Sequence, residues 1–254
     1  MSREAQAPRR SLSDRAAAGP LEEIADGVWL LCGGLQRIMN VYFVRDTGRD
    51  GVLVFDGGIR SMTGAVAAAG ARLGGITRVV LGHGHADHRG VPAALGVPVL
   101  CHPAERSSVE GDGGFSELRF ERLPVPYRYV MPRALRRWDG GPVEVAATLE
   151  EGDEIAGFRV IDLPGHTRGQ IGLWRERDGV ALTTDCFYAV DGRTGRKGDG
   201  RPRMPQAAYT ADEAGARRSL RKLAALAPAI VGPGHGDPVH GNVAAQLERA
   251  ARDT

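Results

Sequence analysis

The chain has 254 residues, with 33 Lys or Arg and 31 Asp or Glu interspersed along it for a formal net charge of +2. This balance excludes the concentrated basic surface of a dedicated nucleic-acid binder, and no nucleic-acid partner is expected. The 36 Gly and 15 Pro indicate many turns between short elements, which excludes a long helical bundle.

Residues 1–20 are charged and small, and we expect them to form a disordered arm ahead of a single domain over 21–254. They contain no apolar signal segment. No stretch approaches the ~20 continuous apolar residues that cross a bilayer, so the expected location is cytoplasmic, with no membrane partner.

The first half of the domain alternates strands with helices. In chain order, the predicted elements are strands at Val28–Leu31, Val41–Val44 and Val52–Phe55, a helix at Ser61–Leu73, a strand at Arg78–Leu81, a short helix near Val91–Leu95, and a strand at Val97–Leu100. This alternation favours a layered α/β domain.

The stretch at about 107–142 interrupts this rhythm, because it is rich in Arg, Pro and aromatic residues without a clean period. We interpret it as an insertion or lid. The pattern then resumes with strands at Val143–Leu149, Phe158–Leu163, Ile171–Trp174, Val180–Thr184 and Ala229–Val231, and with helices at Ala211–Ala227 and Asn242–Arg252.

The loop after the strand Arg78–Leu81 places four potential metal ligands within six residues. They are His83, His85, Asp87 and His88. Imidazole nitrogens and carboxylate oxygens are ligands that a cation such as Zn²⁺ prefers. Because one loop cannot surround an ion, this interpretation requires ligands from other strand ends.

Three later strands do end in such residues. His166 follows the first of them in Pro164-Gly165-His166, Asp185 ends the second, and His235 lies in Pro233-Gly234-His235 after the third. The flanking Gly and Pro predict tight turns that project these side chains beyond the sheet edge. The four segments are therefore expected to form one site.

In this order, the motifs resemble those of the metallo-β-lactamase superfamily, and the resemblance extends from about Glu22 to Ala251. It implies a four-layer αββα sandwich of the α/β class. It also implies two metal ions, taken as Zn²⁺ with Fe or Mn as alternatives. The first ion is assigned to His83, His85 and His166, the second to Asp87, His88 and His235, with Asp185 bridging the two and Asp56 supporting the loop.

Asp185 makes the site similar to those of glyoxalase II thioesterases and lactonases. The resemblance implies a dinuclear zinc hydrolase that cleaves an ester, thioester or lactone carbonyl by attack of a metal-bridging hydroxide. Asp87 would relay a proton. Tyr188, three residues after Asp185, would contact the substrate carbonyl.

Other interpretations remain open. A persulfide dioxygenase-like oxidoreductase would hold one iron through His83, His166 and Asp185, a phosphodiesterase would use both ions, and a scaffold protein would have lost catalysis. The arginines of 107–142 and of the loop 193–203 would favour an anionic small-molecule substrate if they lined the site. A homodimer is also left open.

Three residues are set apart from the site. His102 and His240 are interpreted as structural or capping residues. Cys186 is adjacent to Asp185 and, one position along, is expected to point to the opposite face, away from the metals.

Overall fold

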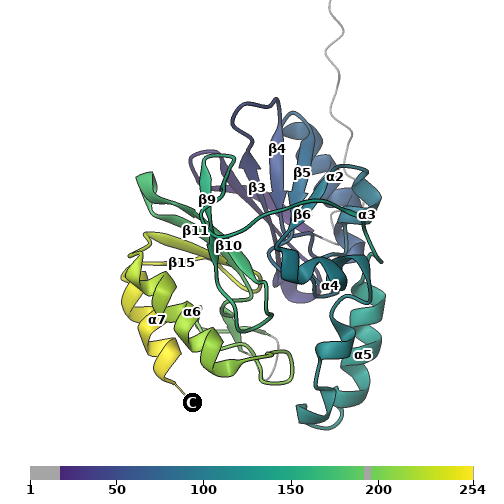
Figure 1. Cartoon of the computed structure of the whole chain (residues 1–254), viewed down its shortest axis with the longest axis vertical. Coiled ribbons are helices and arrows are strands. Elements are labelled where there is room, and N and C mark those ends of the chain that lie inside the picture. The colour runs from purple at the N-terminus through teal and green to yellow at the C-terminus, as the bar shows by residue number, and fades with distance from the viewer. Residues whose placement is uncertain (1–17, 192–195, 254) are drawn as a thin grey trace, which may run out of the picture.

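The computed structural model describes residues 18–191 and 196–253. Its strands form two sheets that face each other, with helices on the outer side of each (Figure 1). A third, two-stranded pair, β12 (Val190–Asp191) and β13 (Arg196–Lys197), lies outside these sheets.

The first sheet has seven strands in sequence order. β1 to β4 form an antiparallel meander, and β4 to β7 are parallel, joined by connections that contain the helices of this half. The strands are β1 (Ala18–Ala25), β2 (Val28–Gly33), β3 (Met39–Arg45), β4 (Val52–Phe55), β5 (Ile76–Val80), β6 (Val99–Cys101) and β7 (Val145–Thr148).

The second sheet has six strands in the order β15-β14-β11-β10-β9-β8. All neighbours are antiparallel except β11 and β14, which are parallel because α6 connects them. The strands are β8 (Glu154–Ile155), β9 (Phe158–Asp162), β10 (Ile171–Arg175), β11 (Val180–Thr184), β14 (Ile230–Pro233) and β15 (Val239–His240).

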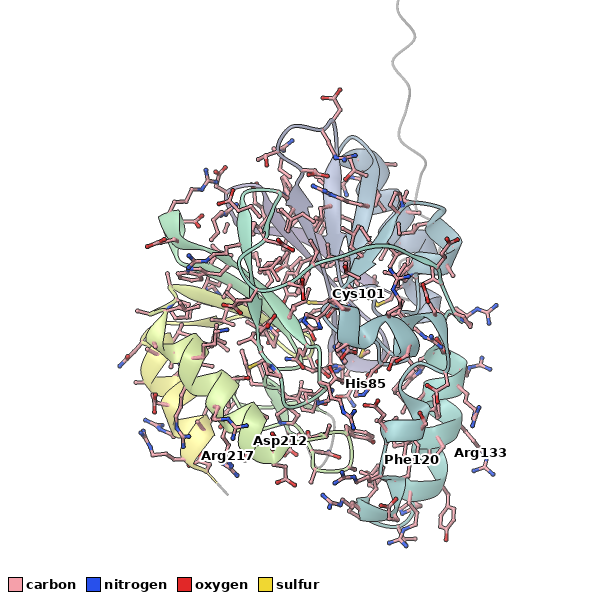
Figure 2. The ribbon with its side chains drawn as sticks, viewed as in Figure 1. His85, Cys101, Phe120, Arg133, Asp212 and Arg217 are labelled. Atoms are coloured by element: carbon pink, nitrogen blue, oxygen red, sulfur yellow. The ribbon has the colours of Figure 1, made fainter. Side chains whose placement is uncertain are left out.

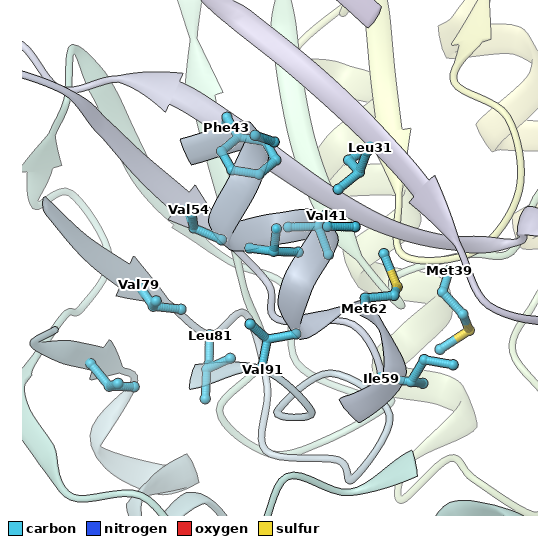
Figure 3. Close-up of a cluster of buried hydrophobic side chains, with 14 of the residues drawn as sticks. Leu31, Met39, Val41, Phe43, Val54, Ile59, Met62, Val79, Leu81 and Val91 are labelled. Carbon is cyan, nitrogen blue, oxygen red and sulfur yellow. The ribbon is translucent and has the colours of Figure 1, made fainter. Parts of the chain in front are cut away.

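Three apolar clusters hold four layers together. One, which includes Phe55 and Leu173, fills the space between the sheets. A second packs the outer face of the first sheet against α2 (Thr63–Arg72), and Figure 3 shows its Val41, Val54 and Met62. The third packs the second sheet against α6 (Glu213–Ala225) and α7 (Val243–Arg252). The predicted αββα sandwich is confirmed.

The segment at about 107–142 is a helical excursion between β6 and β7. It contains the end of α4 (Arg106–Glu110), two 3-10 turns and α5 (Tyr127–Trp138), while α3 (Pro92–Leu95) precedes it. The absence of a clean period reflects the shortness of these pieces, and α5 contains Pro132.

The predicted strands and long helices match the structure to within a few residues, whereas β1, β8, β12, β13 and β15 were not predicted. Of the predicted disordered arm, residues 1–17 lie outside the described part, and residues 18–20 belong to β1, which pairs with β2. Among the described helices, none combines the length and hydropathy that a bilayer span requires.

Candidate metal centre

The predicted ligands lie in loops at the carboxyl ends of strands. The loop from His83 to His88 follows β5, and His166, Asp185 and His235 follow β9, β11 and β14. In the second sheet, β9, β11 and β14 run in the same direction, so their carboxyl ends meet at one edge of the sandwich. His85 lies at this edge, between the two halves of the molecule (Figure 2).

The first cluster consists of His83, His85 and His166, all buried, with one ligand atom of each within 4.8 Å of the others. Nε2 of His166 lies 3.0 Å from Nδ1 of His85. Nδ1 of His83 is 2.8 Å from the Thr184 hydroxyl, which leaves its buried Nε2 without a hydrogen-bond partner. A buried nitrogen of this kind fits a metal ligand.

The second cluster consists of Asp87, His88 and His235, whose ligand atoms also lie within 4.8 Å of one another. The Nε2 atoms of His88 and His235 are 3.3 Å apart, and Oδ2 of Asp87 is 3.6 Å from Nε2 of His235. The two clusters contain the residues assigned to the two ions from the sequence.

Asp185 lies between the clusters. Its Oδ2 is 3.5 Å from Nε2 of His166, 3.3 Å from Nε2 of His88 and 3.2 Å from Nε2 of His235. Its buried Oδ1 has no hydrogen-bond partner. The site thus groups buried imidazole nitrogens of both clusters around one carboxylate. Ligand atoms of these types suit divalent cations.

Asp56 supports the second cluster from behind, as expected. Its Oδ2 accepts a hydrogen bond from Nδ1 of His88 at 2.9 Å, and its Oδ1 accepts one from the backbone N–H of Gly82 at 3.0 Å. Bonding through Nδ1 directs Nε2 of His88 toward Asp185. Asp56 has a positive φ of 61°, which turns the chain sharply at the end of β4.

Glu105 has a comparable function that the sequence did not reveal. This buried carboxylate accepts hydrogen bonds at 2.8 Å from the backbone N–H of Gly84 and at 2.8 Å from that of Gly169. It thereby connects the loop of His83 to the loop of His166. Glu105 belongs to a one-turn 3-10 helix, so no periodic pattern identifies it.

Burial and the charge of Asp185 together control the protonation of the site: although burial lowers the pKa of His88 and His235, Asp185 outweighs it and raises both. Burial lowers the pKa of His83 and of His166 well below the usual imidazole value, so both rings are neutral at neutral pH. Burial also disfavours an ionised Asp185, but His235 and His88 outweigh it and hold the pKa of that carboxyl well below its usual range. Neutral imidazole and ionised carboxylate are the forms that bind a cation.

A cavity of about 730 Å³ opens beside the clusters. Tyr188 lines it and packs edge-on against His235, with ring centroids 5.0 Å apart. Burial and the charge of Asp185 raise the pKa of Tyr188 well above its usual value, so its hydroxyl keeps its proton. Tyr209, which no motif indicated, lines the same cavity.

The residues set apart from the site lie away from the clusters. The ring of His102 accepts a hydrogen bond from the Ala104 N–H at the start of a 3-10 helix, so its capping role is confirmed. His240 is exposed in β15 and does not begin α7, whose N-cap is Asn242. Cys186 is buried in the cluster under α6 and α7, on the face opposite the metal ligands.

Most arginines of the insertion do not reach the cavity. In the described part of the chain, Arg122 is the one arginine that lines it, and Arg122 is paired with Glu213 at 3.5 Å. Arg133 points outward from α5 (Figure 2) and donates to the Tyr129 carbonyl. Arg193 of the later loop lies outside the described residues.

Comparison with known proteins identifies the family to which this chain belongs. The profile described as "Metallo-beta-lactamase superfamily" matches residues 36–235. Two probable metallo-hydrolases of Bacillus subtilis (strain 168) are similar to the chain. YqjP is 28% identical over 204 residues, covering 71% of this chain and 60% of that protein. YflN is 29% identical over 245 residues, covering 90% of each.

A hydroxyacylglutathione hydrolase of Fuscovulum blasticum is 33% identical over 184 residues, covering 70% of this chain. The chain spans 54% of that protein, as it spans 60% of YqjP. Among solved structures, a metallo-beta-lactamase family protein from Thermus thermophilus is 25% identical, with a TM-score of 0.63 and coverage of 90% of this chain and 79% of that one.

Proposed function

The chain belongs to the metallo-beta-lactamase superfamily, and on that premise we propose that it is a metal-dependent hydrolase that holds two zinc ions and cleaves the carbonyl bond of an ester, thioester or lactone. The first cluster would hold one ion and the second cluster the other. Asp185 would be their shared ligand.

The position of Asp185 carries this proposal. One of its oxygens lies 3.2 to 3.5 Å from imidazole nitrogens of both clusters. Without cations, this arrangement crowds three imidazole nitrogens around one carboxylate oxygen and leaves Nε2 of His83 and Oδ1 of Asp185 buried without a partner, which is costly. With two cations, each buried donor gains a partner.

When bound, the ions supply Lewis acidity and lower the pKa of water toward neutrality. The protein contributes the rest. Asp87 lies at the border of the second cluster and the cavity, with a partly accessible side chain, where its carboxylate can accept and return a proton. Tyr188 presents a protonated hydroxyl to the same cavity, where it can donate a hydrogen bond to the carbonyl oxygen of a substrate.

Carbonyl substrates are favoured over phosphodiesters by the surroundings of the site. A phosphodiester would have the two ions as its cationic partners and little further charge to position it, because Arg122 is the one arginine among the described cavity residues and it pairs with Glu213. The similarity to a hydroxyacylglutathione hydrolase supports hydrolysis of a carbonyl bond.

The test combines metal counting with a substrate panel. Elemental analysis of purified protein should give two zinc ions per chain, with turnover of acyl thioesters, esters or lactones and none of a phosphodiester. Asp185→Asn should lower kcat by about a thousand-fold or more with an unchanged circular dichroism spectrum. Glu150→Gln, on the exposed surface, is the matched control and should keep full activity.

Contrary results identify the other candidates. One iron per chain with oxygen uptake would replace the hydrolase by an oxidoreductase. Cleavage of the phosphodiester alone would make it a phosphodiesterase, and full activity of Asp185→Asn would remove the shared-ligand role.

A further inference from the structure

The wall of the cavity beside the metal clusters is almost entirely apolar. Beyond the clusters, two of its polar residues are Gln36 and Gln206, and the ion-paired Arg122 is its one charged side chain within the described residues. The rest of the described wall is hydrocarbon or aromatic, and its members include Met39, Ile59, Leu123, Met131, Leu135 and Trp138.

Three separate parts of the fold build this wall. Met39 begins β3 and Ile59 lies in the connection between β4 and α2, and both are 4% exposed. Leu123 and Leu135 come from the insertion and are also 4% exposed, and Ala208 comes from the loop before α6. Because these side chains converge from distant segments on one space, the cavity is a product of the fold and not a gap left by one loose loop.

The apolar lining continues from the metal clusters to the surface. At the inner end the cavity touches His85, Asp87, Asp185 and His235. At the outer end it is bordered by Tyr127 and Val130 of α5, which are 44% and 52% exposed. A bound molecule would thus have one end at the metals and an apolar body along α5.

We propose that the substrate is an acyl ester, thioester or lactone with a medium or long hydrocarbon chain, and that this chain lies in the cavity under α5 while the carbonyl lies at the metals. This inference rests on the proposed function and adds the substrate class. The cavity volume of about 730 Å³ is within the ~300–1,000 Å³ range of ligand pockets, which bury most of a ligand.

A polar substrate body fits this wall poorly. A glutathione moiety has two carboxylates, an ammonium and two amides, and most of them would lose water against side chains that offer few hydrogen bonds. An alkyl chain loses nothing on leaving water and gains about four-fold in affinity for each methylene that is fully buried.

The experiment measures kcat/KM for a homologous series of N-acetylcysteamine thioesters with acetyl, hexanoyl and dodecanoyl groups. We expect kcat/KM to rise by about a hundred-fold or more from acetyl to dodecanoyl. Ala134→Phe adds a ring to the cavity wall on α5. It should abolish most of this gain and leave acetyl turnover within about three-fold of wild type.

Arg137→Phe is the matched control, because it adds the same ring to an exposed position of α5 that does not line the cavity. It should keep the full chain-length dependence. A binding measurement gives a second readout: 11-(dansylamino)undecanoate should bind the wild type with enhanced fluorescence, be displaced by dodecanol, and bind Ala134→Phe at least about ten-fold more weakly.

The two proposals fail differently. Turnover that is independent of chain length, or equal loss of acetyl and dodecanoyl activity in Ala134→Phe, overturns the acyl cavity but keeps the hydrolase. Absence of turnover for every carbonyl substrate overturns the hydrolase, and a dansyl probe that then binds wild type and Ala134→Phe equally overturns the cavity as well.

Discussion

The carboxylate of Asp56 lies 2.9 Å from Nδ1 of His88 and directs the opposite nitrogen of that ring toward the second cluster. The two residues belong to different strand ends, β4 and β5, which are parallel neighbours. This hydrogen bond fixes the ring in the orientation that a second metal ion needs.

Asp56→Asn should therefore selectively weaken the binding of the second ion. The amide cannot accept from both Gly82 and His88, so we expect the affinity for the second zinc to fall by about 10 to 100-fold while the first is retained. Zinc titration against a chromophoric chelator measures both affinities. Asp46→Asn, which removes a buried carboxylate paired with Arg78, controls for general destabilisation. An equal loss of both ions would contradict the assignment.

Glu105→Gln should loosen two ligand loops at once. An amide NH₂ would face the N–H of Gly84 or of Gly169, so one backbone donor loses its acceptor at a cost of about 1–3 kcal/mol in the free energy of unfolding. Urea denaturation measures this loss, and exposed Glu150→Gln should show almost none. Unchanged stability would mean that the two hydrogen bonds contribute nothing.

Gly234→Ala should disrupt the metal site by overpacking it, without creating a cavity. A Cβ at this position would overlap Oδ1 of Asp185 and lie 2.7 Å from Cε1 of His88. We expect loss of zinc from purified protein and loss of about 1–3 kcal/mol of stability from overpacking. Gly19→Ala, whose Cβ would meet nothing nearer than 3.5 Å, should retain full metal content. Normal zinc content in Gly234→Ala would contradict the close approach of Gly234 to the side chains of Asp185 and His88.

Arg89 joins the histidine loop to the insertion. Its guanidinium makes two hydrogen bonds to Asp139, at 2.9 and 2.8 Å, and donates to the carbonyls of Ser108, Val109 and Gly111. The side chain is buried, so its N–H groups depend on these partners and not on water.

Arg89→Lys should consequently cost about 3–5 kcal/mol in the free energy of unfolding, because one ammonium cannot replace the planar fork and cannot make all the hydrogen bonds that the buried guanidinium donates. Chemical denaturation followed by tryptophan fluorescence checks this value. Arg133→Lys on the exposed side of α5 should change stability by less than about 0.5 kcal/mol. If both substitutions had equal effects, the buried network would have no special role.

Tyr188→Phe should lower kcat by about a hundred-fold with little change in KM, because the hydroxyl is proposed to bind the carbonyl oxygen more strongly as negative charge develops on it. Steady-state kinetics on a hydrolysed thioester separate the two constants. Tyr127→Phe, at the cavity rim, should leave kcat near the wild-type value. A change confined to KM would indicate ground-state binding only.

The sequence by itself determined the apolar strands and the chemical types of the metal ligands, because these depend on local patterns. Val52–Phe55 and Val180–Thr184 are nearly continuous apolar runs, and His83 to His88 is a dense local motif whose order with His166, Asp185 and His235 indicated the fold. Strands β1, β8, β12, β13 and β15 were missed, since polar residues and turns obscure their alternation.

Only the tertiary structure decided how these residues work together. Glu105 acts through partners 21 and 64 positions away, and no local pattern encodes such contacts. The resemblance indicated that Asp56 supports the histidine loop, but its two partners, Gly82 and His88, came from the structure. The sequence left open whether arginines of the insertion line the site; the helical path of 107–142 presents its apolar side chains to the cavity and Arg133 to the outside. Which face of a short, proline-containing helix is buried depends on what packs against it, and that is settled by the sandwich as a whole.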